Sequence, residues 1–224
     1  MQLIIGNYNY STWSMRAWLL VHRFDLPVSV MCRNLFTEDM KAVLEGRFSN
    51  GKVPLLLDGN FEVWDSLAIL EYLGERFPEI RPWPDDAAAR AVARSVSAEM
   101  HSSFSAIRSE APMNLRRRFP GYRLGPEALD DVARIQSVWR YCRQRFGTQG
   151  PWLFGDFSIA DAMFAPVVMR FRSVEVALDE TATSYCETVS GDSSVMEWIR
   201  RAWTESHVVA EDEIDWPSEP ATGT

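Results

Sequence analysis

The stretch that most constrains the fold runs from Lys52 to Ser66 and reads Lys-Val-Pro-Leu-Leu-Leu-Asp-Gly-Asn-Phe-Glu-Val-Trp-Asp-Ser. Two short apolar runs flank an Asp-Gly-Asn turn, which is typical of a β-hairpin because glycine adopts positive φ at little steric cost. Pro54 stands at the start of the first strand, where a missing N–H costs little. Helical spacing begins at Leu67, and Asp65 or Ser66 can cap that helix. The stretch therefore predicts a hairpin followed directly by a helix.

Alternating strand and helix patterns precede this hairpin. Residues 3–6 predict a short buried strand, residues 13–21 a helix, residues 28–35 a second strand and residues 37–47 a second helix. The resulting order, βαβαββα, fits a thioredoxin-like α+β unit with parallel strands joined by a helix and then an antiparallel pair. We expect this N-terminal domain to span residues 1–78.

The pattern changes to helices alone in the second part of the chain. Residues 79–86 contain prolines and no periodic pattern, so we expect them to link two domains. An all-helical C-terminal domain is expected over residues 87–224. Its helices are predicted at 87–111, 126–146, 157–171 and 193–206. The acidic, proline-containing tail from about residue 211 is expected to be mobile.

Composition limits the function classes. The net charge of −8 over 224 residues argues against a nucleic acid or an anionic membrane as the main partner. The three cysteines are far apart, which excludes a Cys-x-x-Cys metal or redox pair and suits a reducing compartment. We see no metal-ligand spacing, no secretory-signal pattern and no apolar run that could cross a bilayer. We therefore expect a soluble, cytoplasmic protein without a metal.

Three motifs resemble the cytosolic glutathione S-transferase superfamily, over essentially residues 1–206. The first is Val-Pro-Leu-Leu from Val53, followed by the hairpin and by Asp-Ser at the helix start. The second is Ser158 with Asp161 three residues later, a capping box similar to the one that opens the family's buried C-domain helix. The third is Tyr-Ser-Thr-Trp-Ser-Met-Arg over residues 10–16, which resembles the loop of bacterial serine-type, theta- and zeta-like members.

The resemblance implies a glutathione site in the N-terminal domain. In the family the bond before Pro54 is cis, and the backbone of Val53 pairs with the peptide-like ligand as an added strand. Ser66, at a helix start, would hold the γ-glutamyl carboxylate. Asp65 would face the ligand's α-amine, and Lys52 would lie near its glycine carboxylate.

The same resemblance implies a hydroxyl that donates to the glutathione sulfur. A thiol with a pKa of about 8.5 is only a few per cent ionised at neutral pH, and the thiolate is the nucleophile. We favour Ser11 for this role, with Thr12 second and Ser14 as the helix N-cap. Tyr8 and Tyr10 remain competitors, because other classes use a tyrosine early in the chain.

Trp13 stands where omega- and beta-like members carry a cysteine. Its presence argues against thiol–disulfide chemistry, and the missing cysteine weakens a transfer of zeta-type isomerase activity. We expect the acceptor pocket between the domains, with Trp13, Met100, Phe104 and Arg108 in its wall. Met100 and Phe104 also fit a core helix face, and Arg108 could hold an anionic acceptor.

The sequence thus predicts a homodimeric glutathione transferase that uses glutathione as co-substrate and attacks an electrophilic, largely apolar small molecule. The sequence does not identify that acceptor. One alternative is a non-catalytic scaffold or regulatory protein, as stringent-starvation-type members are, although the intact Asp65–Ser66 pair argues against it. The other alternative is an isomerase that uses glutathione without consuming it.

Overall fold

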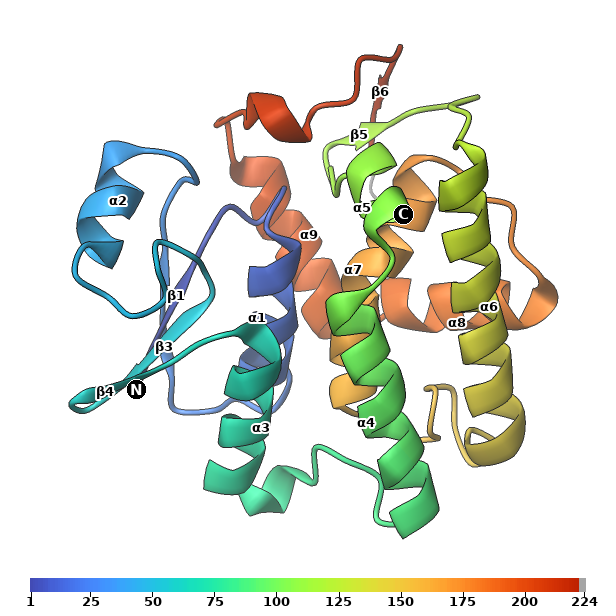
Figure 1. The fold of residues 1–224 in the computed structure, drawn as a ribbon, viewed down its shortest axis with the longest axis horizontal. Helices are drawn as coiled ribbons and strands as arrows, with labels where there is room; N and C mark the ends of the chain where they lie inside the picture. The colour runs from blue at the N-terminus through green and yellow to red at the C-terminus, as the bar shows by residue number, and fades with distance from the viewer. Residues whose placement is uncertain (222–224) are drawn as a thin grey trace.

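The computed structural model describes residues 1–221 and shows a small mixed sheet with its helices beside a larger helical region (Figure 1). The sheet strands are β1 (Gln2–Ile5), β2 (Ser29–Cys32), β3 (Leu55–Asp58) and β4 (Phe61–Val63). Their order is β2-β1-β3-β4, with β2 parallel to β1, and β3 antiparallel to both β1 and β4. Gly59 takes a φ of 57° in the predicted turn between β3 and β4. The predicted thioredoxin-like order is confirmed.

Three helices accompany the sheet: α1 (Thr12–Arg23), α2 (Glu38–Leu44) and α3 (Ser66–Arg76). A short 3-10 turn, η1 (Pro78–Ile80), follows α3. Helix α1 packs against α3 on one side, and against α7 and α9 of the helical region on the other. Its face contributes fully buried side chains, including Trp18, Leu19 and Leu20, to one continuous core that joins both parts of the chain.

The helical region contains α4 (Ala87–Ser102), α5 (Ser105–Glu110), α6 (Pro126–Phe146), α7 (Ile159–Ser173), α8 (Glu180–Ser190) and α9 (Ser193–Thr204). Helix α7 is central, since all but one of its residues are buried and it packs against α1, α4 and α8. The expected helical character of this region is confirmed. No helix among residues 1–221 has both the length and the apolar character needed to span a bilayer.

The helix predicted over residues 87–111 is two helices, which corrects the sequence analysis. Helix α4 ends at Ser102, and Phe104 adopts a φ of 64° before α5 begins. This bend turns the Phe104 ring into the core, while Asp131 of α6 accepts a hydrogen bond from the Ile107 N–H at 3.0 Å. Tertiary packing and a side-chain cap therefore replace the local helical preference.

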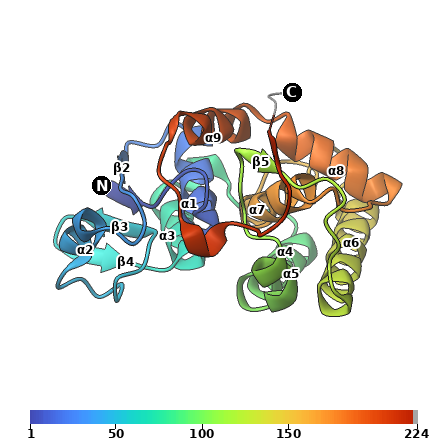
Figure 2. The ribbon, with the colours of Figure 1, turned by 90° about the horizontal axis from the view of Figure 1, so that it is seen from above.

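The chain beyond α9 follows a defined course up to residue 221, and the mobility expected from about residue 211 stays a prediction. It contains a 3-10 turn, η2 (Ala210–Asp212), and a short strand, β6 (Glu219–Pro220), that pairs with β5 (Arg117–Arg118). Figure 2 shows this red segment running from the end of α9 past α1 and α7 to β5. Residues 222–224 of the expected tail lie outside the described residues.

Candidate functional site

The stretch predicted to pair with glutathione lies at the start of β3. The Val53–Pro54 peptide bond is cis, as the resemblance implies. Pro54 is buried, Val53 is partly buried and Lys52 is exposed. Among residues 1–221, neither the N–H nor the C=O of Val53 has a hydrogen-bond partner. These two groups are therefore free to pair with an extended, peptide-like ligand.

The Asp65–Ser66 pair forms the start of α3, as predicted. One carboxylate oxygen of Asp65 accepts hydrogen bonds from the N–H groups of Leu67 (3.0 Å) and Ala68 (3.4 Å), so Asp65 is the N-cap. Ser66 is fully buried, and its Oγ has no hydrogen-bond partner within the described chain. An unpartnered hydroxyl at the positive end of an eleven-residue helix is suited to a carboxylate.

A contact that the sequence did not predict covers the start of α3. The second carboxylate oxygen of Asp65 lies 2.9 Å from His101 Nε2 of α4, which joins the two parts of the chain. The His101 ring also packs edge-on against Trp13, with ring centroids 5.2 Å apart. A ligand ammonium group on Asp65 would compete with His101. Because Ser66 has no exposed surface, a ligand reaches its hydroxyl only after neighbouring side chains move.

The hydroxyls before α1 are arranged differently from the prediction. Ser14 lies inside α1 and is not its N-cap, because the helix begins at Thr12 and Ser11 takes the capping position. The buried Oγ of Ser14 accepts hydrogen bonds from Gly6 N–H (3.0 Å) and from Ser11 Oγ (2.7 Å). Ser14 thus satisfies a buried backbone N–H that would otherwise be unpaired.

Thr12 presents the hydroxyl with no internal partner. Its N–H donates to Tyr10 O at 2.9 Å, but within residues 1–221 its hydroxyl makes no hydrogen bond. Ser11 shares its hydroxyl with Ser14, and in such a pair either oxygen can donate. Both candidates, Ser11 and Thr12, lie at the positive end of α1, where a thiolate would be stabilised.

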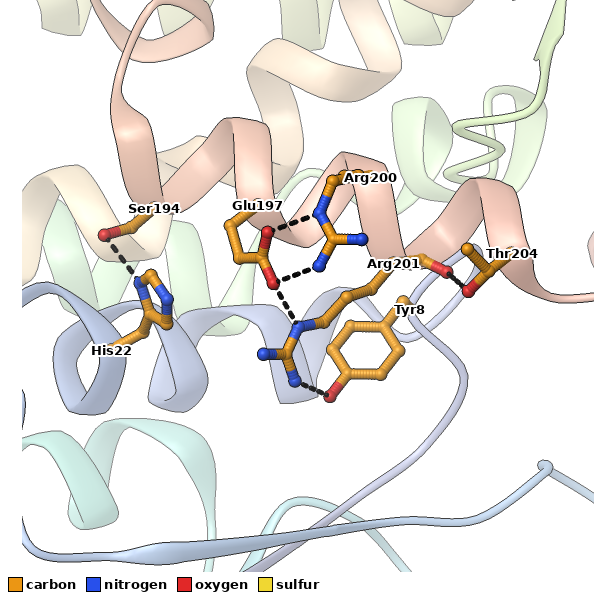
Figure 3. Close-up of polar contacts among 7 residues, drawn as sticks. All are labelled: Tyr8, His22, Ser194, Glu197, Arg200, Arg201 and Thr204. Carbon is orange, nitrogen blue, oxygen red and sulfur yellow. Dashed lines mark hydrogen bonds and ion pairs between the residues drawn. The ribbon is translucent and has the colours of Figure 1, made fainter.

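Tyr8 is engaged by α9 (Figure 3). Its hydroxyl accepts a hydrogen bond from Arg201 Nη1 at 3.1 Å, and Glu197 holds the same guanidinium at 2.7 Å. His22 Nδ1 lies 3.0 Å from Ser194 Oγ, which joins α1 to α9 nearby. Burial raises the pKa of Tyr8. The Tyr8 hydroxyl therefore acts as an acceptor in the contact between the two domains, while its own O–H has no acceptor among residues 1–221.

Tyr10 is engaged in the same way by the C-terminal segment. Its hydroxyl donates to the Glu213 carboxylate and accepts from Arg116 Nη2 at 2.9 Å. Burial and the hydrogen bond to Glu213 raise the pKa of Tyr10. The two tyrosine competitors are thus both used inside the fold.

The backbone of this loop is fixed by the second half of the chain. Glu205, which follows α9, accepts hydrogen bonds from the N–H groups of Tyr8 (2.8 Å) and Asn9 (2.9 Å). The Asn9 side-chain oxygen accepts in turn from the N–H groups of Leu115 (2.8 Å) and Arg116 (3.0 Å). The loop that carries Ser11 and Thr12 is therefore positioned by residues distant in sequence.

The four residues predicted for the acceptor pocket separate into two pairs. Trp13 and Arg108 lie together, with the guanidinium 5.0 Å from the ring centre, and both are partly exposed. Met100 and Phe104 are buried in the core. Arg16, which the sequence analysis did not select, lies 4.3 Å from the Trp13 ring centre and is 1% exposed.

Arg16 is a buried cation with few neighbouring groups that offset its positive charge. Its Nε and Nη1 atoms have no hydrogen-bond partner in the described part of the chain. Burial, with the positive charges of Arg108 and Arg170, lowers the pKa of Arg16 well below its usual value. A negatively charged group beside Trp13 would relieve this repulsion and satisfy the free donors.

The cysteines carry no sign of nucleophilic chemistry. Burial raises the pKa of Cys32, Cys142 and Cys186 to about 12 in each case. Each thiol is therefore protonated at neutral pH, and a protonated thiol is a poor nucleophile. Among residues 1–221 no group of His, Cys, Asp and Glu is arranged to hold a metal ion.

Comparison with known proteins identifies relatives of both parts of the chain. Residues 10–76 match the family model of the glutathione S-transferase N-terminal domain, and residues 87–201 match that of its C-terminal domain. The chain is 27% identical over 176 residues to the glutathione S-transferase GstB of Escherichia coli strain K12, covering 74% of this chain and 81% of that protein.

Solved structures share the fold at lower identity. A glutathione transferase homolog from Burkholderia gl BGR1, with bound glutathione, superposes with a TM-score of 0.69 at 23% identity and covers 91% of this chain and 98% of its own. A maleyl pyruvate isomerase, described as a bacterial zeta-class glutathione S-transferase, gives 0.68 at 18% identity over 92% and 100% of the two chains.

Proposed function

Since the chain belongs to the glutathione S-transferase family, we propose that it binds glutathione and transfers its sulfur to an electrophilic, largely apolar small molecule. The observation that carries this proposal is the buried, unpartnered hydroxyl of Ser66 at the start of α3. We assign glutathione to a domain of residues 1–78, joined by residues 79–86 to a helical domain of residues 87–224.

In the proposed complex each end of glutathione has a matching group. The γ-glutamyl carboxylate accepts from the Ser66 hydroxyl and from the Ser66 N–H, which has no partner among residues 1–221. Asp65 takes the α-amine in place of His101. The free backbone groups of Val53 pair with the middle of the ligand, and Lys52 lies near its glycine carboxylate.

In the proposed reaction a hydroxyl at the start of α1 stabilises the glutathione thiolate. The thiolate then forms a carbon–sulfur bond to the electrophile, and the displaced group or the new carbanion takes up a proton from solvent. Lowering the thiol pKa by two units requires about 2.7 kcal/mol of differential stabilisation. Thr12 becomes the stronger candidate donor, because Ser11, favoured from sequence, shares its hydroxyl with Ser14.

A glutathione-dependent isomerase is a second candidate. The observation that favours it is the uncompensated Arg16, which lies with Arg108 beside Trp13 and suits an acceptor that carries a carboxylate. We also propose a cytoplasmic homodimer. The large exposed side chains Phe61 and Trp64 offer apolar surface to a second copy, and light scattering of the purified protein measures its mass.

The first experiment is a calorimetric titration of glutathione into the purified protein, with the bound thiolate followed by ultraviolet absorbance across pH. We expect binding and a thiol pKa below about 7.5, against about 8.5 for a free thiol. Binding with an unshifted pKa would instead support the isomerase or a carrier role. Absence of binding at millimolar glutathione would contradict the enzyme proposal and favour a scaffold.

A further inference from the structure

A cavity of about 800 Å³ lies within the helical region, away from the residues assigned to glutathione. It is open to solvent and is lined by β5 and the segment that leads into it, the second half of α7, the turn after α7, the end of α8 and the face of α9. Figure 2 shows β5, α7, α8 and α9 gathered on this side of the molecule. None of Ser11, Thr12, Asp65 or Ser66 lines it.

The inner surface of the cavity is largely apolar. Its apolar lining residues include Leu115, Met169, Phe171, Val176, Ile199 and Trp203. Trp203 is 42% exposed and Met196, also in the lining, is 51% exposed, so large apolar side chains remain uncovered there. The Trp203 indole N–H donates to Leu115 O at 3.0 Å, which holds this wall in place. Such a lining and volume are typical of a small-molecule site.

Positive charge is concentrated on the same cavity. The charged lining residues are Arg117, Arg118, Arg172, Arg200 and Glu175. Arg118 pairs with Glu175 at 2.6 Å, and Arg200 pairs with Glu197 at 2.7 Å. Neither Arg117 nor Arg172 has a carboxylate partner in the described part of the chain. Against a net charge of −8 for the whole chain, this is a local excess of cations.

One hydroxyl in the wall of the cavity also lacks a partner. The Oγ of Ser190, at the end of α8, is buried and makes no hydrogen bond within residues 1–221. Buried hydroxyls are normally paired, but this oxygen has no accessible surface and is not open to the cavity. The cavity therefore combines an apolar interior with two guanidinium groups that have no carboxylate partner among residues 1–221.

We propose that this cavity is a second ligand site, which binds a small amphipathic carboxylate. The aliphatic chain lies against Phe171, Ile199 and Trp203, and the carboxylate accepts hydrogen bonds from Arg117 and Arg172. Guanidinium groups bind carboxylates through paired charge-assisted hydrogen bonds, and the apolar chain gains free energy by leaving water. The proposal does not depend on glutathione binding at Ser66.

The test compares three ligands that share a chain and differ in the head group: decanoate, decanol and decyltrimethylammonium. Calorimetric titration is expected to show decanoate binding at least about tenfold more tightly than decanol, because the head group makes charged hydrogen bonds. The cation is expected to bind more weakly still. Each methylene removed, as in octanoate, should weaken binding about fourfold. Equal affinity for decanoate and decanol would overturn the proposal, as would no binding at all.

Two pairs of variants locate the ligand. The double substitution Arg117→Met with Arg172→Met is expected to lower decanoate affinity about tenfold or more and to leave decanol affinity unchanged. Arg145→Met, an exposed arginine outside the cavity, is the charge-matched control and should change neither. Met196→Glu should abolish decanoate binding, while Met196→Leu should retain it. An effect of Arg145→Met equal to that of the double variant would contradict the assignment.

Discussion

Several hydroxyl groups lie near the expected position of the glutathione sulfur, and some of them make hydrogen bonds within the fold. Tyr8 and Tyr10 are held by Arg201 and Glu213, and burial raises the pKa of both phenols. Ser14 satisfies the N–H of Gly6. Ser11 and Thr12, at the positive end of α1, are the candidate donors to a thiolate.

Thr12→Val tests the choice between these two. The substitution removes the hydroxyl and nearly preserves the shape, so we expect the pKa of bound glutathione thiol to rise by about one to two units, the equivalent of one charge-assisted hydrogen bond. Affinity for glutathione should change less than the pKa. Ultraviolet absorbance of the thiolate measures the shift, and Ser11→Ala is the parallel variant. If only Ser11→Ala raises the pKa, the sequence-based preference for Ser11 stands.

Ser66→Ala separates a binding role from a structural one. The Ser66 Oγ has no partner among residues 1–221, so its removal should not lower the free energy of unfolding. Glutathione affinity should fall by about 1–3 kcal/mol, the worth of a hydrogen bond to a charged group. Ser97, in α4, is equally buried and its Oγ is equally unpartnered in the described chain. Ser97→Ala should therefore leave affinity unchanged, and an equal loss in both variants would argue against a contact with Ser66.

For helices and strands, the sequence predicted the boundaries that are set by residues adjacent in the chain, such as turns and caps. The Asp-Gly turn, Asp65 at the start of α3 and the capping box at α7 are all present as predicted. The break at Phe104 depends on Asp131 of another helix, so no local pattern could reveal it. Helix α8 was missed although Ala182, Tyr185 and Val189 follow helical spacing, because polar residues dilute that pattern.

The capping box carries a pH-dependent contribution to stability. The Asp161 carboxyl accepts hydrogen bonds from Ser158 N–H, Leu153 N–H and Tyr185 OH, yet burial raises its pKa to about 6. The unfolded carboxyl has a pKa of about 3.9, so between the two values the folded state binds more protons. The contribution is then complete below about pH 4 and decreases as the pH rises to about 6.

Asp161→Asn isolates this contribution. An amide brings an N–H₂ group against donors that need an acceptor, so we expect a loss of about 2–4 kcal/mol in the free energy of unfolding. The difference between wild type and variant should shrink by about 2–3 kcal/mol between pH 4 and pH 7. Urea unfolding across that range measures it, with Asp156→Asn, exposed just before the box, as the control. A difference that grows with pH would mean that the folded-state pKa of Asp161 is lowered.

Across the whole molecule, the loop of residues 7–12 belongs to the N-terminal sheet by sequence and to the helical region by its contacts. Glu205, Asn114 and Glu213 bind it from positions about one hundred to two hundred residues away. The sequence predicted the loop and the residue types, but not these partners, since pairing between distant segments leaves no periodic signal. The same holds for the Asp65–His101 contact.

Glu205→Ala tests whether the contacts between Glu205 and this loop serve thiol activation as well as stability. The substitution leaves the N–H groups of Tyr8 and Asn9 without their charged acceptor, which should cost about 1.5–3 kcal/mol in the free energy of unfolding. Because Ser66 and Val53 are on other segments, glutathione affinity should persist, while a looser loop should raise the pKa of the bound thiol. Glu211→Ala, an exposed carboxylate in the same C-terminal segment, is the matched control and should change neither quantity.

If Glu205→Ala lowers stability but leaves the thiol pKa unchanged, the contacts of Glu205 with the loop hold the domains together without positioning the hydroxyl. A loss of both glutathione affinity and thiol activation would instead place part of the ligand on the loop itself.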